Sequence, residues 1–307
     1  MDRINSLPTP FSHLISSLSH LLIASDTLLC KMTNTTIGSA SEFQENYLLL
    51  EKLGEGGYGS VYMCLERLTA NRRAVKSIPD NKVRNRTHVE SLNQSLPNEI
   101  VLWGPLRHPN IVSLLEVFLD SSSQTWWMVM EFQPGYLDLF HHVDDVGPLS
   151  EEDSVGIIRQ LLNVVQYLTL HDVDHRDLKD ENILYNPTTK HIKLIDFGSS
   201  SPLSPAPYTF FRGTDVYIPP EYFNTRKYLP LHASTWAIGC IAFILLDGDS
   251  PFQNRDEIKE FKAIEDLNPK YSEHSSRLDF IRCCMDPNPD TRILLSEIAD
   301  HSWLSGF

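Results

Sequence analysis

The hydrophobic pattern of this chain changes once, near residue 135, and that change limits the folds open to it. Before residue 135, short apolar and β-branched runs alternate with Gly, Asn, Pro and Ser, which predicts strands of an antiparallel sheet. These runs cover residues 48–51, 61–65, 73–78, 112–118 and 126–131, with one helix expected at 96–106. The later apolar residues follow helical spacing and predict helices at 150–170, 231–247, 255–265, 276–285 and 294–301. We therefore expect an α+β fold in which a small β-rich lobe precedes a larger helical lobe.

Composition narrows the class of protein. Of the 307 residues, 41% are hydrophobic and 21% charged, which is typical of a compact globular chain. The net charge of −14 disfavours nucleic acid as a partner. Five scattered cysteines without paired spacing indicate free thiols in a reducing compartment, so we expect a cytoplasmic or nuclear protein. No run approaches the ~18 apolar residues of a membrane span, and we expect a monomer without membrane contact. Residues 1–45 predict a poorly ordered extension.

A glycine-rich segment, residues 54–61, lies between two expected strands. The spacing of Gly54, Gly56 and Gly59 also suits a dinucleotide-binding turn or a plain hairpin. A dinucleotide-binding turn should open a helix, whereas here the strand beginning at Val61 follows. The pattern therefore favours a flap whose backbone lies over phosphate groups.

Lys76 lies inside an apolar run, where an ammonium group needs an anion nearby. Glu99, on the expected helix, is the candidate partner, and the ion pair would hold the ammonium against nucleotide phosphates. The alternative is a lysine whose aliphatic stem lies along the sheet while its charge stays in water.

The densest group of functional side chains is His175-Arg176-Asp177-Leu178-Lys179-Asp180-Glu181-Asn182, followed by Asp196-Phe197-Gly198. A solvated charged loop is the alternative, but phosphoryl transfer needs this set of groups. Asp177 would orient or accept the acceptor's hydroxyl proton, and Lys179 would neutralise the γ-phosphate. Asn182 and Asp196 would hold Mg²⁺ through oxygen ligands. Strand-like segments border both acidic clusters, so a short hairpin could bring them together.

These motifs, taken in order, resemble the eukaryotic protein kinases over residues 47–304. Further matches are Pro219-Pro220-Glu221 and the late Arg292, which pairs with that glutamate in such kinases. Lys179 is typical of the serine/threonine branch. The resemblance implies a bilobal kinase domain at 46–304, with an N-lobe at 46–130, a hinge at 131–139, a C-lobe at 140–304 and a short tail at 305–307. It also implies transfer of phosphate from ATP, with Mg²⁺, to Ser or Thr of protein substrates.

Within that branch the chain is most similar to the Pim kinases, a calcium/calmodulin-kinase-related family. The similarity rests on HRDLKDENILY, KLIDFGSSS, FRGTDVYIPPEYF, GDSPFQNRDEI and a hinge that contains Pro134. Pro134 lacks an N–H donor, so we expect adenine to be anchored by the Glu131 carbonyl, with Met130 behind it. The resemblance implies an ATP-binding set of Leu53, Gly54, Glu55, Gly56, Gly57, Tyr58, Gly59, Ser60, Val61, Ala74, Lys76, Glu99, Met130, Glu131 and Leu184.

The sequence departs from the family pattern at Ser234-Thr235-Trp236, where most kinases carry an aspartate first that braces the catalytic loop. No catalytic group is lost, but a pseudokinase acting as a binding scaffold remains the alternative function. A small-molecule phosphotransferase is disfavoured because the peptide-docking segment from Gly213-Thr214 to Glu221 is kept. We expect Thr214 to contact the catalytic loop, which is the segment at 175–182.

Negative charge gathers in the middle of the chain. Residues 131–200 carry 13 acidic and 5 basic side chains, a net charge of −8. We expect Asp138, Asp180, Glu181 and Asp249 to read basic residues upstream of the phosphoacceptor, although an ordinary solvated acidic face would look the same. Arg176 could bind a phosphate on the activation loop, yet similarity to the Pim kinases implies activity without that modification.

Overall fold

The computed structural model describes residues 37–56, 59–261 and 275–306. Gly57, Tyr58 and the end of the helix expected at 255–265 lie outside the described residues. The chain divides into two compact units. Unit 1 runs to Pro105 and includes Leu114–Met130, whereas unit 2 comprises Leu106–Ser113 and the chain from Glu131 onward.

The segment 106–113 belongs to unit 2, although the expected boundary put it in the first lobe. Its hydrogen bonds explain the difference. The N–H of Val112 donates to the carbonyl of Leu194 at 3.1 Å. The side-chain amide of Asn110 donates to the carbonyl of Ile192 at 2.9 Å and to Gln160 at 2.8 Å. Buried polar groups need such partners, and here unit 2 supplies them.

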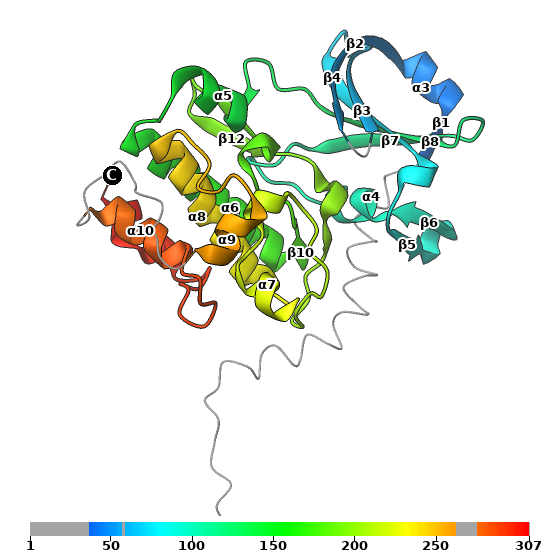
Figure 1. Ribbon diagram of the computed structural model, residues 1–307. Coiled ribbons are helices and arrows are strands. Elements are labelled where there is room, and N and C mark those ends of the chain that lie inside the picture. The colour runs from blue at the N-terminus through cyan, green and yellow to red at the C-terminus, as the bar shows by residue number, and fades with distance from the viewer. Residues whose placement is uncertain (1–36, 57–58, 262–274, 307) are drawn as a thin grey trace, which may run out of the picture. The chain divides into compact units, whose positions relative to one another are not determined.

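Unit 1 is built on one six-stranded sheet (Figure 1). Its strand order is β1 (Ile37–Ser39), β7 (Leu114–Asp120), β8 (Thr125–Glu131), β4 (Arg72–Pro79), β3 (Gly59–Glu66) and β2 (Tyr47–Gly56). A separate hairpin of β5 (Arg86–Val89) and β6 (Gln94–Pro97) lies beside the helix α4 (Asn98–Trp103). The five expected strands are all present, most of them longer than the apolar runs that predicted them.

The expected extension at 1–45 is wrong at its end, because residues 37–46 fold onto the sheet. Strand β1 pairs in parallel with β7, and helix α3 (Ala40–Asn46) follows it. Ser39 and Glu42 form a reciprocal capping box at the start of α3. On the other face of that helix Phe43 is buried against Tyr47, Phe118 and Trp127, with ring centroids 5.1–5.5 Å away. These aromatic contacts hold the segment in place.

The helix expected at 96–106 is shorter than predicted. Leu96 pairs with Thr87 in the β5–β6 hairpin, so β6 occupies the residues where the expected helix would begin. Pro97 has no N–H to give and precedes the helix, and Gly104 caps its end. Apolar periodicity could not separate a buried strand end from a helix start at this point.

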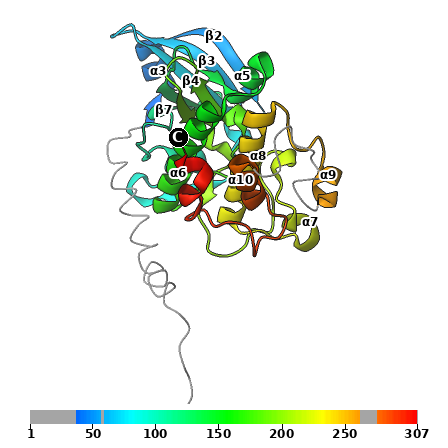
Figure 2. The same ribbon diagram turned by 90° about the vertical axis from the view of Figure 1, so that its left-hand side faces the viewer.

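Unit 2 is mainly helical. Among the residues that the structure describes, its α-helices are α5 (Leu139–Val146), α6 (Glu151–Leu170), α7 (Glu221–Thr225), α8 (Pro230–Asp247), α9 (Arg255–Glu260), α10 (Ser276–Cys284) and α11 (Ser302–Ser305). Helix α8 packs against both α6 and α10 (Figure 2). Its length and hydropathy would allow a membrane span, but 83% of it is buried inside the protein, as in a core helix.

The helix expected at 294–301 is replaced by a 3₁₀ turn at Ile298–Asp300, and a separate helix, α11, follows. His301 ends the turn because its backbone is extended and its ring nitrogen accepts the N–H of Trp303, which caps α11. The side-chain capping at His301 breaks the periodic segment in two.

Candidate active site

In unit 1, Lys76 and Glu99 form a buried ion pair. Lys76 lies on β4, Glu99 lies in the first turn of α4, and Nζ and Oε1 are 2.7 Å apart. Both residues are less than 10% exposed. The pairing expected from the sequence is present, and the lysine does not extend its charge into water. A buried pair of this kind is strongly destabilised when one partner is removed.

The glycine segment joins β2 to β3 in an antiparallel hairpin, with Gly56 opposite Gly59. A strand therefore follows the glycines, as expected, and no helix starts there among the described residues. Gly59 has a steric requirement of its own. A Cβ atom added at Gly59 would come 2.0 Å from the carbonyl oxygen of Ser77, so only glycine fits.

The other unit 1 residues of the expected ATP-binding set differ in exposure. Ala74 on β4 and Met130 on β8 are buried, whereas Val61 and Ser60 on β3 are half-buried. Leu53 on β2 is 47% exposed and therefore accessible to a ligand. Gly54 and Glu55 are exposed on the same strand.

In unit 2, a short hairpin brings the two acidic motifs together. Strand β11 (Ile183–Asn186) pairs with β12 (His191–Leu194), and Ile183 lies opposite Leu194. Just beyond this pair, the N–H of Ile195 donates to the carbonyl of Asn182 at 3.0 Å. Asp196 follows directly, with a left-handed backbone (φ 62°) and a carboxylate that accepts the N–H of Gly198. The hairpin expected from the sequence is present.

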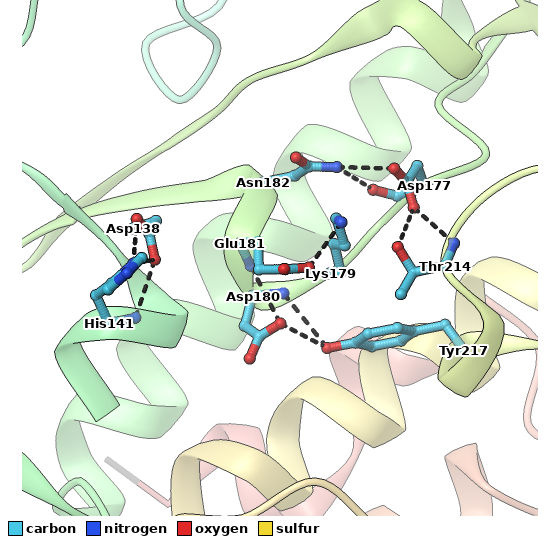
Figure 3. Close-up of polar contacts among 9 residues, drawn as sticks. All are labelled: Asp138, His141, Asp177, Lys179, Asp180, Glu181, Asn182, Thr214 and Tyr217. Atoms are coloured by element: carbon cyan, nitrogen blue, oxygen red, sulfur yellow. Dashed lines mark hydrogen bonds and ion pairs between the residues drawn. The ribbon is translucent and has the colours of Figure 1, made fainter. Parts of the chain in front are cut away.

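Asp177 is held from two sides (Figure 3). The side-chain amide of Asn182 donates to the Asp177 carbonyl at 2.8 Å and to its Oδ2 at 3.2 Å. Thr214 donates its N–H and its hydroxyl to Oδ1 at 3.0 and 3.1 Å. The contact expected between Thr214 and the catalytic loop is therefore present. Asn182 ends the 3₁₀ turn at Asp180–Asn182 and Thr214 lies in a loop, and together they fix the direction of the carboxylate.

Lys179 forms an ion pair with Glu181, with Nζ and Oε2 2.6 Å apart. Burial lowers the pKa of Lys179, but the bond to Glu181 and the nearby Asp177 outweigh it and leave the pKa raised. Lys179 is therefore a fixed cation beside Asp177. The Glu181 carboxylate is half-exposed and is the neighbouring counter-charge.

Asp180 does not suit the substrate-reading role expected of it. Its side chain is buried, and the hydroxyl of Tyr217 donates to Oδ1 at 2.9 Å and accepts the N–H of Asp180 at 3.4 Å. Burial raises the pKa of this carboxyl, and the bond from Tyr217 opposes the rise. Asp180 instead ties the catalytic loop to the 3₁₀ turn at Asp215–Tyr217. Sequence reasoning missed Tyr217, because nothing in its spacing marked it as a partner.

The remaining substrate candidates are at least partly accessible. Asp138 caps α5 by accepting the N–H of His141 at 2.9 Å, and it also bonds the His141 ring, which raises the pKa of that imidazole. Asp249 is exposed.

Two residues of the expected ATP-binding set lie in unit 2. The candidate hinge residue Glu131 donates its N–H to the carbonyl of Ser113, and its carboxylate pairs with Lys193 at 2.9 Å. Leu184 lies half-buried on β11.

Arg176 contacts the activation segment, residues 196–221, and Tyr228 beyond its end. Its guanidinium lies 4.2 Å from the ring centroid of Tyr208 and donates to the Tyr228 hydroxyl at 3.0 Å and the Phe210 carbonyl at 2.8 Å. The backbone of Arg176 has φ 65°, and its N–H donates to the carboxylate of Asp174. Burial raises the pKa of Asp174 to about 6. The sequence suggested Arg176 as a phosphate ligand but gave no sign of these aromatic partners.

The expected pair of Glu221 and Arg292 is present and buried. Two parallel bonds join them, at 3.0 Å (Nη1 to Oε1) and 2.8 Å (Nη2 to Oε2). The guanidinium also lies 5.2 Å from the ring of Trp236. This bidentate geometry is the strongest form of an arginine–carboxylate contact.

Ser234, where the family carries an aspartate, does not brace the catalytic loop through a carboxylate. It is buried, and its hydroxyl donates to the carbonyl of Pro230 one turn earlier in α8. Two small cavities lie beside it, and Asp174 and Leu178 line part of each. The loop is anchored by Thr214 and Tyr217 instead.

One group of potential metal ligands in the described ranges lies away from these motifs, at Asp279, Cys283 and His301. Nδ1 of His301 accepts the N–H of Trp303, so Nε2 carries the ring proton and faces Asp279 at 3.3 Å. A metal would need the lone pair of that nitrogen. Asp279 and His301 therefore form a hydrogen-bonded pair between α10 and the start of α11.

Comparison with known proteins agrees with this geometry. The protein kinase domain family matches residues 47–304. This chain belongs to the protein kinase family. It is 32% identical to serine/threonine-protein kinase pim-2 of Danio rerio over 270 residues, covering 85% of this chain and 86% of that protein. Serine/threonine-protein kinase prk-2 of Caenorhabditis elegans is 32% identical over 266 residues, covering 86% of this chain and 59% of that protein.

Calcium-dependent protein kinase 8 of Oryza sativa subsp. japonica is 35% identical over 269 residues, covering 84% of this chain. The chain spans 48% of the length of that kinase. Together these relatives confirm a serine/threonine protein kinase related to the calcium/calmodulin-kinase group, with the fold expected from the sequence.

Proposed function

We propose that this kinase uses ATP and Mg²⁺ to phosphorylate Ser or Thr in proteins that carry basic residues before the acceptor, and that it does so without phosphorylation of its activation segment. The arrangement around Asp177 carries the proposal. Asn182 and Thr214 hold the Asp177 carboxylate in place, so it can orient a hydroxyl group. The fixed cation Lys179 lies next to it and can stabilise the transferred phosphoryl group.

The oxygen donors fit a hard divalent cation. The amide nitrogen of Asn182 is used on Asp177, and its oxygen points away from that residue (Figure 3). Asp196 supplies a carboxylate close along the β11–β12 hairpin. Oxygen ligands of these two kinds are the ones that Mg²⁺ prefers. When bound, Mg²⁺ would neutralise phosphate charge. The buried Lys76, fixed by Glu99, would contribute a second cation for the nucleotide phosphates.

Substrate charge is the second part of the proposal. With Asp180 buried, Asp138, Glu181 and Asp249 remain as carboxylates with accessible surface to attract basic side chains. The test compares an Arg-rich peptide with a neutral peptide in Asp138→Asn, Glu181→Gln and Asp249→Asn. Asparagine at 138 can still cap α5, so the change removes charge and keeps the helix. We expect KM to rise several-fold more for the Arg-rich peptide. Equal changes for both peptides contradict charge recognition, and exposed Glu45→Gln in unit 1 is the control.

Contacts between Arg176 and the activation segment support activity without phosphorylation. Arg176 already binds the Phe210 carbonyl, the Tyr228 hydroxyl and the Tyr208 ring, so the segment has an anchor that requires no phosphate. Thr214 uses its hydroxyl on Asp177. The test removes phosphate from the protein and checks by mass spectrometry that none remains. We expect this phosphate-free protein to phosphorylate peptides at the rate of the untreated protein. A phosphate-free preparation that is inactive until another kinase modifies it would contradict this part.

A further inference from the structure

An exposed ion pair stands next to the residue that holds the catalytic carboxylate. Asp215 follows Thr214 directly, and Thr214 donates two hydrogen bonds to Asp177. One side-chain oxygen of Asp215 lies 2.6 Å from the guanidinium of Arg255, the first residue of α9. The two side chains are 57% and 56% exposed. This pair has no part in the functions described above.

The position of Asp215 is fixed although its side chain is exposed. It starts the 3₁₀ turn that ends at Tyr217, and Tyr217 is buried with its hydroxyl bonded to Asp180. Thr214 fixes the other side of the turn through Asp177. The turn that contains Asp215 is therefore anchored to the catalytic loop at both ends. A fixed backbone keeps the Asp215 carboxylate at a defined position, where a bound peptide could contact it.

The partner of Asp215 is easily displaced. Exposed ion pairs are worth little in water, because solvent screens them and two long side chains must be ordered. Arg255 also sits in the first turn of a helix, next to Asp256 and Glu257, where the helix dipole favours the acidic residues over a cation. A cation on a bound peptide could replace Arg255 at small cost.

We propose that Asp215 selects a basic residue immediately beside the phosphoacceptor, and that Arg255 competes for the same carboxylate. The inference rests on the proposed function, because it assumes a peptide hydroxyl at Asp177. An extended peptide advances about 3.4 Å per residue. A residue adjacent to the acceptor then comes beside the residue that follows Thr214.

The test uses peptides of one Arg-rich sequence that differ only in the residue before or after the acceptor serine, which is Lys or Gln. The measured quantity is the ratio of kcat/KM for the Lys peptide to kcat/KM for the Gln peptide. We expect wild type to prefer Lys by about two- to fivefold on one side of the acceptor. Asp215→Asn should bring the ratio to about one, whereas Arg255→Gln should raise it.

Opposite shifts distinguish substrate reading from a structural ion pair, because loss of either partner of a structural pair would act in the same direction. Asp256→Asn, an exposed carboxylate on the same helix, is the matched control and should keep the wild-type ratio. The inference is wrong if Asp215→Asn keeps the wild-type ratio or if Arg255→Gln does not raise it. Failure of the wild-type chain to phosphorylate any peptide would instead overturn the proposed function, and this inference with it.

Discussion

Thr214 donates both its backbone N–H and its hydroxyl to the same oxygen of Asp177, at 3.0 and 3.1 Å. One residue of the activation segment thus sets the direction of the carboxylate. Asn182 holds the other oxygen at 3.2 Å. The orientation of Asp177 depends on the activation segment keeping its present course.

Thr214→Val removes the hydroxyl bond and keeps the backbone bond. We expect kcat to fall about tenfold or more with little change in KM, because a hydrogen bond to a charged group contributes about 1.5–3 kcal/mol. Steady-state peptide phosphorylation measures both constants. Thr214→Ser keeps the hydroxyl and should retain most of the activity. Wild-type kcat in the valine variant would show that the hydroxyl does not position Asp177.

Glu99→Gln replaces the carboxylate that pairs with the buried Lys76 by a neutral amide. We expect the free energy of unfolding to drop by about 3 kcal/mol, since removing one charge of a buried ion pair is costly. Urea unfolding of the variant and the wild type gives the difference. The exposed pair of Lys52 and Glu55 is the control, and Lys52→Gln should change stability by less than about 1 kcal/mol. Equal effects of the two substitutions would contradict the buried pairing.

Asp174 should make stability depend on pH. Burial raises the pKa of its carboxyl to about 6 from an ordinary value of 3.8. Between these values the folded chain holds a proton that the unfolded chain has released, so this carboxyl lowers stability as pH rises from about 4 to about 6. Asp174→Asn stays neutral, and its stability relative to wild type should be about 3 kcal/mol higher at pH 7 than at pH 3.5. An identical difference at both pH values would rule out the raised pKa.

Phe43 should matter for stability although it precedes the residues matched by the kinase family. Its ring is 4% exposed and packs on three other aromatic side chains. We expect Phe43→Ala to reduce the free energy of unfolding by about 3–5 kcal/mol. Thermal and urea unfolding check this, with Leu48→Ala, 42% exposed, as the comparison. A loss below about 1 kcal/mol would mean that α3 contributes nothing to unit 1.

Contiguous motifs were predicted well from the sequence because their residue types and spacing indicate their chemistry. The pair of Lys76 and Glu99, 23 residues apart, was inferred because a lysine inside an apolar run needs an anion nearby. The pair of Glu221 and Arg292, 71 residues apart, was inferred from the resemblance to the kinase family. The spacing of hydrophobic residues predicted the strands and most of the helices, because burial of one face of an element leaves a regular pattern in the sequence.

Contacts made by ordinary residues from distant segments could not be predicted. Nothing in the sequence marks Tyr217 as the partner of Asp180, so a charged residue next to the catalytic motif was read as exposed. The cation–π contact of Arg176 with Tyr208 depends on the path of the activation segment, which no periodic pattern encodes. The fold of 37–46 was missed because it rests on aromatic packing between residues far apart in sequence.

In the proposed function, Asp177 is the group that orients the acceptor hydroxyl for phosphoryl transfer. The most direct measurement is transfer of ³²P from the γ-position of ATP, with Mg²⁺, to an Arg-rich serine peptide by the wild type and Asp177→Asn. We expect phosphorylation by the wild-type chain and a loss of about 10²–10⁴-fold in the variant, the usual contribution of general-base catalysis. Equal rates for the two proteins, or no transfer by the wild type, would contradict the account.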